Sequence, residues 1–263
     1  MKKIIHNIFV VLLICFSFFY TDKVINMINK KDPLMTEIIN YKEEYNILPI
    51  NAYIDGDTIV PGLIGTEIDV EKSYQNMKLG GIFREESLIF KDLYPQSSIS
   101  SNKNKYIIKG NNNKKEVSII TVLNNNIDKI KPLEDITVFI NHKDLTTSNI
   151  KLLKEKEIYP YGNNGIYNNE TLVSDSSLIN RLSNNKSLYC LTKEKNINTL
   201  NTCNKNNMYT VIPTIIGDYY NIKKELSNGS IILLDNLNNI DIIIKYIKSK
   251  GYNIVPLSIL LSE

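Results

Sequence analysis

The chain has 263 residues, which is enough to bury a full core and fits one barrel-sized domain plus a small additional segment. Its 31 basic and 28 acidic residues give a net charge of +3 without a basic block, which argues against nucleic-acid binding. The two histidines are His6, in the N-terminal stretch, and His142, so a multi-histidine metal site is not expected.

The N-terminal stretch combines two lysines with a long apolar run. Lys2 and Lys3 precede the run Ile8–Tyr20, and the hydrophobic stretch counted from Ile4 is 17 residues long. That length is short for a membrane-spanning helix but long for the core of a signal peptide. Because no cleavage pattern of small residues follows, we predict that residues 1–23 are an uncleaved, transmembrane signal anchor in the cell membrane, with the rest of the chain outside. The alternative is a cleaved signal peptide, which would give a secreted protein.

The next two segments differ in composition. Residues 24–45 are polar and rich in lysine, so we expect a spacer, with a short helix near its end. Residues 46–112 are predicted to form a small α+β segment, because apolar alternation around Asp55-Gly56 indicates a β-hairpin and Asp69 is a suitable N-cap for a helix. The sequence Asp55-Gly56-Asp57-Thr58 begins like a calcium loop but lacks the remaining ligands, so we interpret it as a turn.

Short apolar runs alternate with helical patterns over residues 115–263. The strands are expected at residues 117–123, 136–140, 188–191, 209–212 and 231–234. The helices are expected at residues 150–156, 176–181, 199–204 and 240–248. This alternation predicts an α/β fold, a deformed and incomplete (β/α) barrel.

The final stretch has a strand–helix–strand pattern with a family resemblance. A Gly229-Ser230 turn leads into the apolar run Ile231–Leu234, a helix ends at the C-cap Gly251, and the chain closes with Leu257-Ser258-Ile259-Leu260-Leu261. This pattern resembles the last block of the polysaccharide deacetylases, carbohydrate esterases that remove acetyl groups from chitin-like and peptidoglycan sugars. The resemblance covers the second half of the chain and implies a (β/α) barrel.

The resemblance also implies where the catalytic groups of the family would lie. The catalytic histidine of the last block corresponds to Asp235. In the family the first strand ends in two aspartates, one the base and one a metal ligand. Depending on the register, these positions fall on Val122 and Leu123 or on Asn124 and Asn125. None of these four side chains can act as a base or supply a carboxylate ligand.

A second block of the family supplies two metal-binding histidines. Gly162-Asn163 matches the start of that block, but Asn164 and Asn168 stand at the two histidine positions. The arginine-and-proline block that follows in the family has no match around Tyr189, and only Lys193 lies nearby. The resemblance therefore implies a chain that has lost the metal ligands.

Metal-assisted deacetylation needs a zinc-type ion held by Asp and His side chains, and neutral amides are poor ligands without charged companions. We therefore expect no cofactor and predict a pseudoenzyme, a cell-envelope protein that binds surface polysaccharide or an envelope partner in the former active-site groove. The residues expected in this groove are Leu123, Asn124, Asn163, Asn164 and Asp235.

Two alternatives stay open. The first is an active N-deacetylase with an atypical catalytic set, in which Asp235 and His142 or Asp144 would converge in one cleft; otherwise His142 is a solvated loop residue and Asp235 a strand-end carboxylate. The second is a structural scaffold, with the groove filled by large side chains such as Leu123 and Tyr161. A binding module predicts an open groove lined by Tyr and Asn.

The cysteines are Cys15 in the N-terminal stretch, Cys190 and Cys203. Outside the cell, Cys190 and Cys203 could form a disulfide. Since two cysteines are not a disulfide framework, we favour two buried free thiols.

Overall fold

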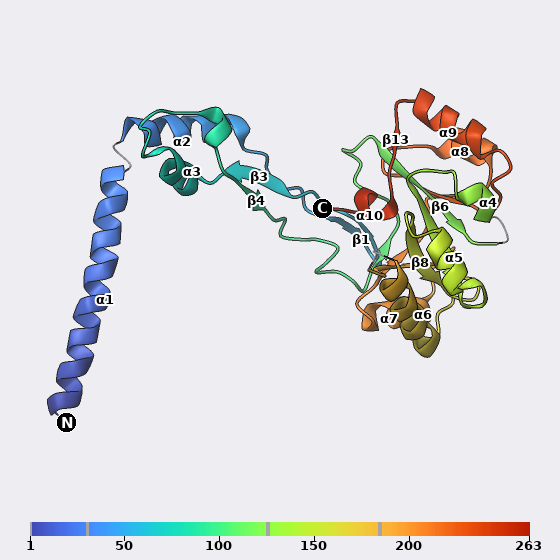
Figure 1. Cartoon of the computed structure of the whole chain (residues 1–263), viewed down its shortest axis with the longest axis horizontal. Helices are drawn as coiled ribbons and strands as arrows, with labels where there is room; N and C mark the ends of the chain where they lie inside the picture. The colour runs from blue at the N-terminus through green and yellow to red at the C-terminus, as the bar shows by residue number, and fades with distance from the viewer. Residues whose placement is uncertain (1, 30–31, 125–126, 184–185) are drawn as a thin grey trace. The chain divides into compact units, whose positions relative to one another are not determined.

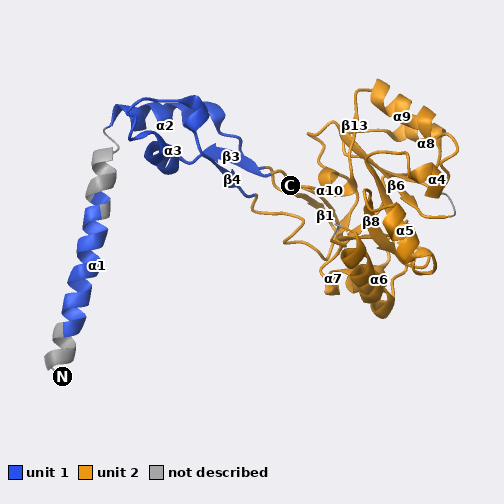
Figure 2. Ribbon diagram, viewed as in Figure 1, with its two compact units in different colours: residues 1–49, 64–94 blue, residues 50–63, 95–263 orange. Residues whose placement is uncertain are grey.

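The structure is a computed structural model that describes residues 2–29, 32–124, 127–183 and 186–263. The chain divides into two compact units (Figures 1 and 2). Unit 1 comprises residues 1–49 and 64–94, and unit 2 comprises residues 50–63 and 95–263.

Unit 1 pairs helices with a small antiparallel sheet. Its elements are α1 (Lys2–Asn29), α2 (Pro33–Tyr45), β3 (Gly65–Ile68), α3 (Val70–Met77), the 3-10 helix η1 (Glu85–Ser87) and β4 (Phe90–Leu93). The predicted cap Asp69 is confirmed, since its carboxylate accepts a hydrogen bond from Lys72 N. The predicted spacer at 24–45 is partly wrong, because α2 buries Leu34 and Ile38 in the core of this unit.

The N-terminal helix α1 differs from the predicted transmembrane anchor at residues 1–23. Among the helices of the described ranges, none is long and apolar enough to cross a membrane. The apolar run Ile8–Tyr20 is shorter than the about 20 residues that a spanning helix needs.

Unit 2 has the predicted α/β fold, and its strands form two sheets. The main sheet has the order β11-β12-β6-β7-β8, with β13 also paired to β6, and all its pairs are parallel. The second sheet has the order β1-β2-β5-β10-β9 and is parallel except for the β1–β2 hairpin. The strands thus form two sheets rather than one closed barrel. The strands of unit 2 are β1 (Tyr53–Asp55), β2 (Thr58–Val60), β5 (Tyr106–Ile107), β6 (Glu116–Val122), β7 (Ile136–Asn141), β8 (Glu157–Tyr161), β9 (Tyr189–Leu191), β10 (Tyr209–Val211), β11 (Ile215–Ile216), β12 (Ile231–Leu234) and β13 (Asn253–Ile254).

The predicted α+β segment at 46–112 is divided between the units. The hairpin at Asp55-Gly56 is confirmed, with Gly56 at a φ of +56°, where glycine is favoured. Its second strand, β2, pairs with β5, and β5 pairs with β10. Because Ile59 and Ile107 are buried in the barrel interior, these strands belong to unit 2 and the predicted boundary near residue 115 is wrong.

Alternating side chains of the main sheet face two different apolar layers. Ile119 and Val138 pack under the helices on the outside, whereas Ile120 and Phe139 point into the interior between the two sheets. The interior also holds Tyr159, in contact with the rings of its neighbouring aromatic residues. Figure 1 shows the helices around the strands. They are α4 (Ile127–Ile130), the 3-10 helix η2 (His142–Asp144), α5 (Thr147–Leu152), α6 (Asn169–Leu182), α7 (Ile197–Lys205), α8 (Tyr219–Glu225), α9 (Ile240–Ser249) and α10 (Leu257–Leu260).

The helix α10 closes the amino end of the main sheet. Leu257 and Leu260 are fully buried in the barrel interior. The backbone N–H of Leu257 donates to Thr137 Oγ1 at 2.9 Å, and Thr137 donates to the Glu157 carboxylate at 2.6 Å. Glu157 also accepts from Ser258 N at 3.2 Å. Thr137 and Glu157 therefore use these polar groups within the fold, bonded to each other and to the α10 backbone.

Candidate functional site

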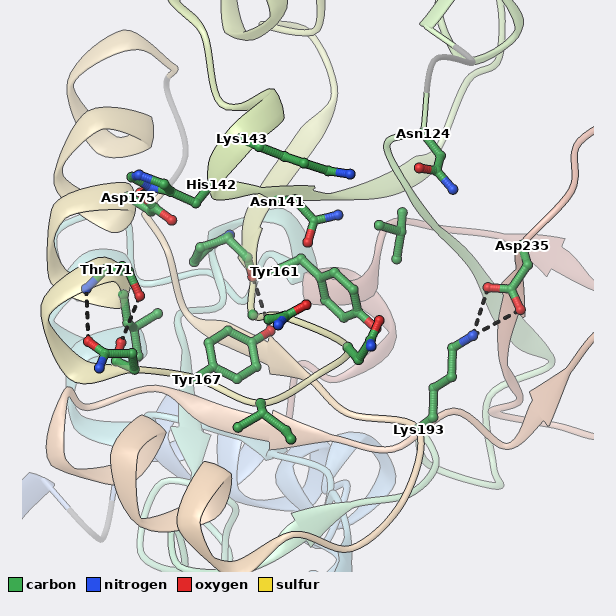
Figure 3. A pocket seen from close by; sticks show the side chains of 18 residues that line it. Asn124, Asn141, His142, Lys143, Tyr161, Tyr167, Thr171, Asp175, Lys193 and Asp235 are labelled. Carbon is green, nitrogen blue, oxygen red and sulfur yellow. Dashed lines mark hydrogen bonds and ion pairs between the residues drawn. The ribbon is translucent and has the colours of Figure 1, made fainter.

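A cleft of about 590 Å³ lies at the opposite, carboxyl edge of the main sheet (Figure 3). Its walls come from the ends of β6, β7, β8 and β12 and from the loop after β9. In (β/α) barrels this edge is where binding and catalytic residues gather. The lining residues that carry the arguments below are Val122, Asn124, Asn141, His142, Lys143, Tyr161, Gly162, Asn163, Asn164, Tyr167, Asn168, Asp175, Lys193 and Asp235.

A tight turn after β8 lines this cleft. Gly165 N donates to Gly162 O, and a side chain at Gly162 would clash with the Ile166 carbonyl, its Cβ lying 2.3 Å from that oxygen. Behind the turn, the buried Tyr167 hydroxyl accepts from Leu191 N at 2.8 Å and donates toward the Pro160 carbonyl at 3.1 Å. These contacts tie the loop after β8 to the next strand, β9.

Tyr161 stands in the middle of the cleft in Figure 3. Its side chain is buried among the interior residues of the barrel. Burial, and then the nearby carboxylate of Asp235, raise the pKa of the Tyr161 hydroxyl. The hydroxyl is therefore protonated at neutral pH and can donate a hydrogen bond.

Asparagine amides line much of the cleft, but they are used differently. Asn168 is the N-cap of α6, and its side-chain oxygen accepts from Glu170 N at 2.9 Å and Thr171 N at 3.4 Å. By contrast, the side-chain amides of Asn141, Asn163 and Asn164 make no hydrogen bond to any residue that the structure describes. The latter three amides therefore keep their donors and acceptors for a ligand.

Two charged pairs stand at opposite ends of the cleft (Figure 3). At one end, Lys193 Nζ lies 3.0 Å from each carboxylate oxygen of Asp235, and both side chains are exposed. At the other end, the exposed His142 contacts the buried Asp175 carboxylate, with 2.6 Å between Nδ1 and Oδ1. The alternative catalytic set of Asp235 with His142 or Asp144 is therefore not assembled, because His142 stands at the other end of the cleft from Asp235 and Asp144 does not line the cleft.

Sequence reasoning missed Asp175 as the partner of His142. Asp175 lies between Leu172 and Ile179 on the buried face of α6. A carboxylate among buried apolar residues at helical spacing is the signal that could have found it, since an acidic residue is rarely buried without a partner.

Most of the predicted groove residues line the cleft, with one exception. Asn124, Asn163, Asn164 and Asp235 all contribute to its wall. The assignment of Leu123 to the groove is wrong: it is buried in the outer apolar layer, and Val122 lines the cleft instead. The cause is the alternation of side chains at the end of a strand. Asn125 lies outside the described residues.

The deacetylase metal does not fit the residues at these positions. Val122 and Asn124 face the cleft from the first strand, while Asn164 has a neutral amide and the oxygen of Asn168 caps a helix. Within the described ranges, no three His, Cys, Asp or Glu side chains are grouped so that they could hold a metal ion. Neutral amides alone are a poor donor set for a zinc-type ion.

A disulfide joins Cys190 in β9 to Cys203 in α7, with 6.4 Å between the Cα atoms. The preference for two free thiols is therefore wrong. The bridge lies in a small buried cluster with Tyr167 and Leu172, which also line the cleft. The approach of α7 to β9 brings the two cysteines together, which a sequence separation of 13 residues does not reveal.

Comparison with solved structures identifies the fold as that of the CE4 carbohydrate esterases, the polysaccharide deacetylase fold. The chain is similar to BA3943, a CE4 family pseudoenzyme from Bacillus anthracis, with a TM-score of 0.64 and 21% identity over 89% of this chain and 96% of that one. It is also similar to a mutant of BA3943 with restored enzymatic activity, with a TM-score of 0.63 and 22% identity over 88% of this chain and 98% of that one.

Sequence comparison gives a narrower match. The chain is 34% identical over 107 residues to YlxY, an uncharacterized protein of Bacillus subtilis (strain 168), and the match covers 39% of this chain. The chain thus spans about a third of the length of that relative, 34%. The search against family models gave no match.

Proposed function

We propose that unit 2 is a non-catalytic relative of the CE4 enzymes that binds carbohydrate in the cleft at the carboxyl edge of its main sheet. The observation that carries this proposal is the set of amides without internal partners, those of Asn141, Asn163 and Asn164. A likeness in fold to BA3943, described as a pseudoenzyme, supports it.

The chemistry of the cleft suits a sugar. Each asparagine amide offers two donors and an acceptor, and sugar hydroxyls need both. The Tyr161 ring adds an apolar surface with a hydroxyl that stays protonated at neutral pH. The volume of about 590 Å³ is within the range of small-molecule sites.

The open cleft favours binding over a purely structural role. A scaffold would fill the former site with large side chains, but Leu123 packs away from the cleft and Tyr161 lines it without closing it. An envelope protein would use the same amides, and it is the alternative occupant if no oligosaccharide binds.

The binding test uses the full chain and oligosaccharides of β-1,4-linked N-acetylglucosamine, followed by isothermal titration calorimetry. Asn141→Ala and Asn163→Ala each remove hydrogen bonds to the ligand, so we expect each to weaken binding by about two- to tenfold. Asn201→Ala is the matched control, because Asn201 is exposed on α7 and does not line the cleft. Equal binding by all these proteins would contradict the proposal.

The absence of catalysis is tested separately. We expect the purified chain to hold no stoichiometric zinc or cobalt and to release no acetate from acetylated chitooligosaccharide or peptidoglycan. Acetate release that is lost in His142→Ala or Asp235→Asn would show that the chain is an active hydrolase with an atypical site.

A location outside the cytoplasm accompanies this proposal. The Cys190–Cys203 disulfide supports it, because disulfides persist in oxidising compartments. Treating intact cells with a protease or with a membrane-impermeant labelling reagent would test whether the protein is accessible from outside.

A further inference from the structure

A second cavity of about 370 Å³ adjoins the cleft at the same edge of the main sheet. It lies beyond the ends of β11 and β12, next to α8 and α9, which pack against each other. The second cavity is lined by Gly217, Asp218, Tyr219, Asn221, Asp235, Asn236, Asn238, Asn239 and Ile243.

The two cavities share one wall residue, Asp235. In Figure 3 Asp235 and Lys193 mark the end of the cleft opposite His142 and Asp175. The second cavity therefore begins where the cleft ends. A molecule that fills both must pass the carboxylate of Asp235.

The Asp235–Lys193 ion pair does not close this passage firmly. The side chains of Lys193 and Asp235 are 43% and 54% exposed. Exposed ion pairs of this kind contribute little to stability. Ligand hydroxyls can therefore take over contacts with either partner at little cost.

The second cavity offers an aromatic surface and an amide without internal partners. Tyr219 packs edge-on against Tyr246 of α9, with 5.3 Å between ring centroids, which fixes its orientation. Asn239 precedes α9 without making a side-chain cap bond, and its side chain has no hydrogen-bond partner among the residues described. A fixed aromatic ring beside a free amide is the same combination as Tyr161 and Asn141 in the cleft.

We infer that the ligand is a linear oligosaccharide that occupies both cavities, with the Tyr219–Asn239 cavity as a second sugar subsite. This inference rests on the proposed function, since it extends the same site. Affinity should therefore depend on the length of the oligosaccharide. A longer oligosaccharide gains contacts with Tyr219 and Asn239 that a disaccharide in the cleft does not make.

The test is a titration of the full chain with the disaccharide, tetrasaccharide and hexasaccharide of β-1,4-linked N-acetylglucosamine. Affinity rises with length in the wild type. Tyr219→Ala and Asn239→Ala each lower affinity for the hexasaccharide by about two- to tenfold and leave affinity for the disaccharide unchanged. Tyr220→Ala is the matched control for the aromatic variant, because Tyr220 is 71% exposed on the same helix and lines neither cavity. Asn239→Ala keeps the test valid if Tyr219→Ala does not fold.

The outcomes separate this inference from the proposed function. A hexasaccharide that binds no tighter than the disaccharide overturns the second subsite and leaves carbohydrate binding in the cleft in place. Variants of Tyr219 and Asn239 that bind the hexasaccharide as tightly as the wild type does also overturn it. A wild-type chain that binds none of the oligosaccharides overturns both proposals.

Discussion

The two edges of the main sheet end in opposite ways. At the amino edge, Leu257 of α10 fills the interior, and the polar groups of Thr137 and Glu157 bond to each other and to the α10 backbone. At the carboxyl edge, the amides of Asn141 and Asn163 face a cleft with no internal partner in the described part of the chain. Polar groups that are hydrogen-bonded within the protein stabilise the fold, whereas polar groups without a protein partner next to a cavity are available to a ligand.

The carboxyl edge also keeps an open cleft where the resemblance to the deacetylases places neutral amides at the positions of metal ligands. By that resemblance, Asn168 and Asn164 correspond to the two histidines; Asn168 caps a helix, while Asn164 faces the cleft. The same substitution of residue type therefore has a structural use at one position and leaves a free amide at the other.

Removing the apolar closure at the amino edge should have the largest effect. Leu257→Ala leaves a cavity in the interior and should lower the free energy of unfolding by about 2–5 kcal/mol. Urea unfolding followed by circular dichroism measures this. Ile259→Ala is the control, because Ile259 is 50% exposed on the same helix and should change stability little. If the two variants are equally stable, α10 does not contribute to the apolar core at the amino edge of the main sheet.

Removing the disulfide should cause the second-largest loss of stability. Replacing Cys190 and Cys203 by serine frees a loop with a sequence separation of 13 residues. Loss of the cross-link should lower the free energy of unfolding by about 3 kcal/mol in the chain-entropy model. Cys15→Ser, which removes the exposed free cysteine, is the matched control. A double variant as stable as the wild type would show that the bridge does not constrain unit 2.

The buried tyrosines predict a loss of stability at alkaline pH. Burial, followed by the nearby Glu157 carboxylate, raises the pKa of Tyr159 above its ordinary value of 10.0. Because the folded state holds this proton more tightly than the unfolded state, the contribution is complete below about pH 10 and is lost as the pH rises above it. Each such tyrosine lowers the free energy of unfolding by at most about 1.4 kcal/mol per pH unit in this range.

Thermal unfolding at pH values from neutral to strongly alkaline would measure this slope. Tyr159→Phe should make the decline above pH 10 shallower, whereas Tyr220→Phe, at an exposed position, should leave it unchanged. An unchanged slope in Tyr159→Phe would place the alkaline loss in other groups.

The sequence predicted those parts of the fold that local patterns determine. The apolar strand Ile231–Leu234, the helix before Gly251 and the hairpin at Asp55-Gly56 are all confirmed, because burial period, capping and turn chemistry act over a few residues. The pairing of that hairpin with β5 was not predicted, since pairing between distant strands leaves no local pattern.

The sequence also predicted part of the candidate site. The resemblance placed Asn163 and Asp235 in the cleft, because family motifs record positions around a site. It did not reveal Asp175, which meets His142 only once α6 packs against the sheet, and it assigned Leu123 rather than Val122 to the wall. Both depend on tertiary packing and on strand register, which a single sequence leaves open.

The smallest expected change in stability comes from substitutions at two asparagines of the cleft, Asn168 and Asn141. Asn168→Ala removes the side-chain acceptor for Glu170 N and Thr171 N, so it should lower the free energy of unfolding by about 1 kcal/mol, and Asn168→Asp should retain the wild-type value. Asn141→Ala breaks no hydrogen bond to the described residues and should change stability by less than about 0.5 kcal/mol. Urea unfolding of the three variants measures the difference. If Asn141→Ala destabilises the chain as much as Asn168→Ala, the Asn141 amide already serves the fold, and it is not held free for a sugar.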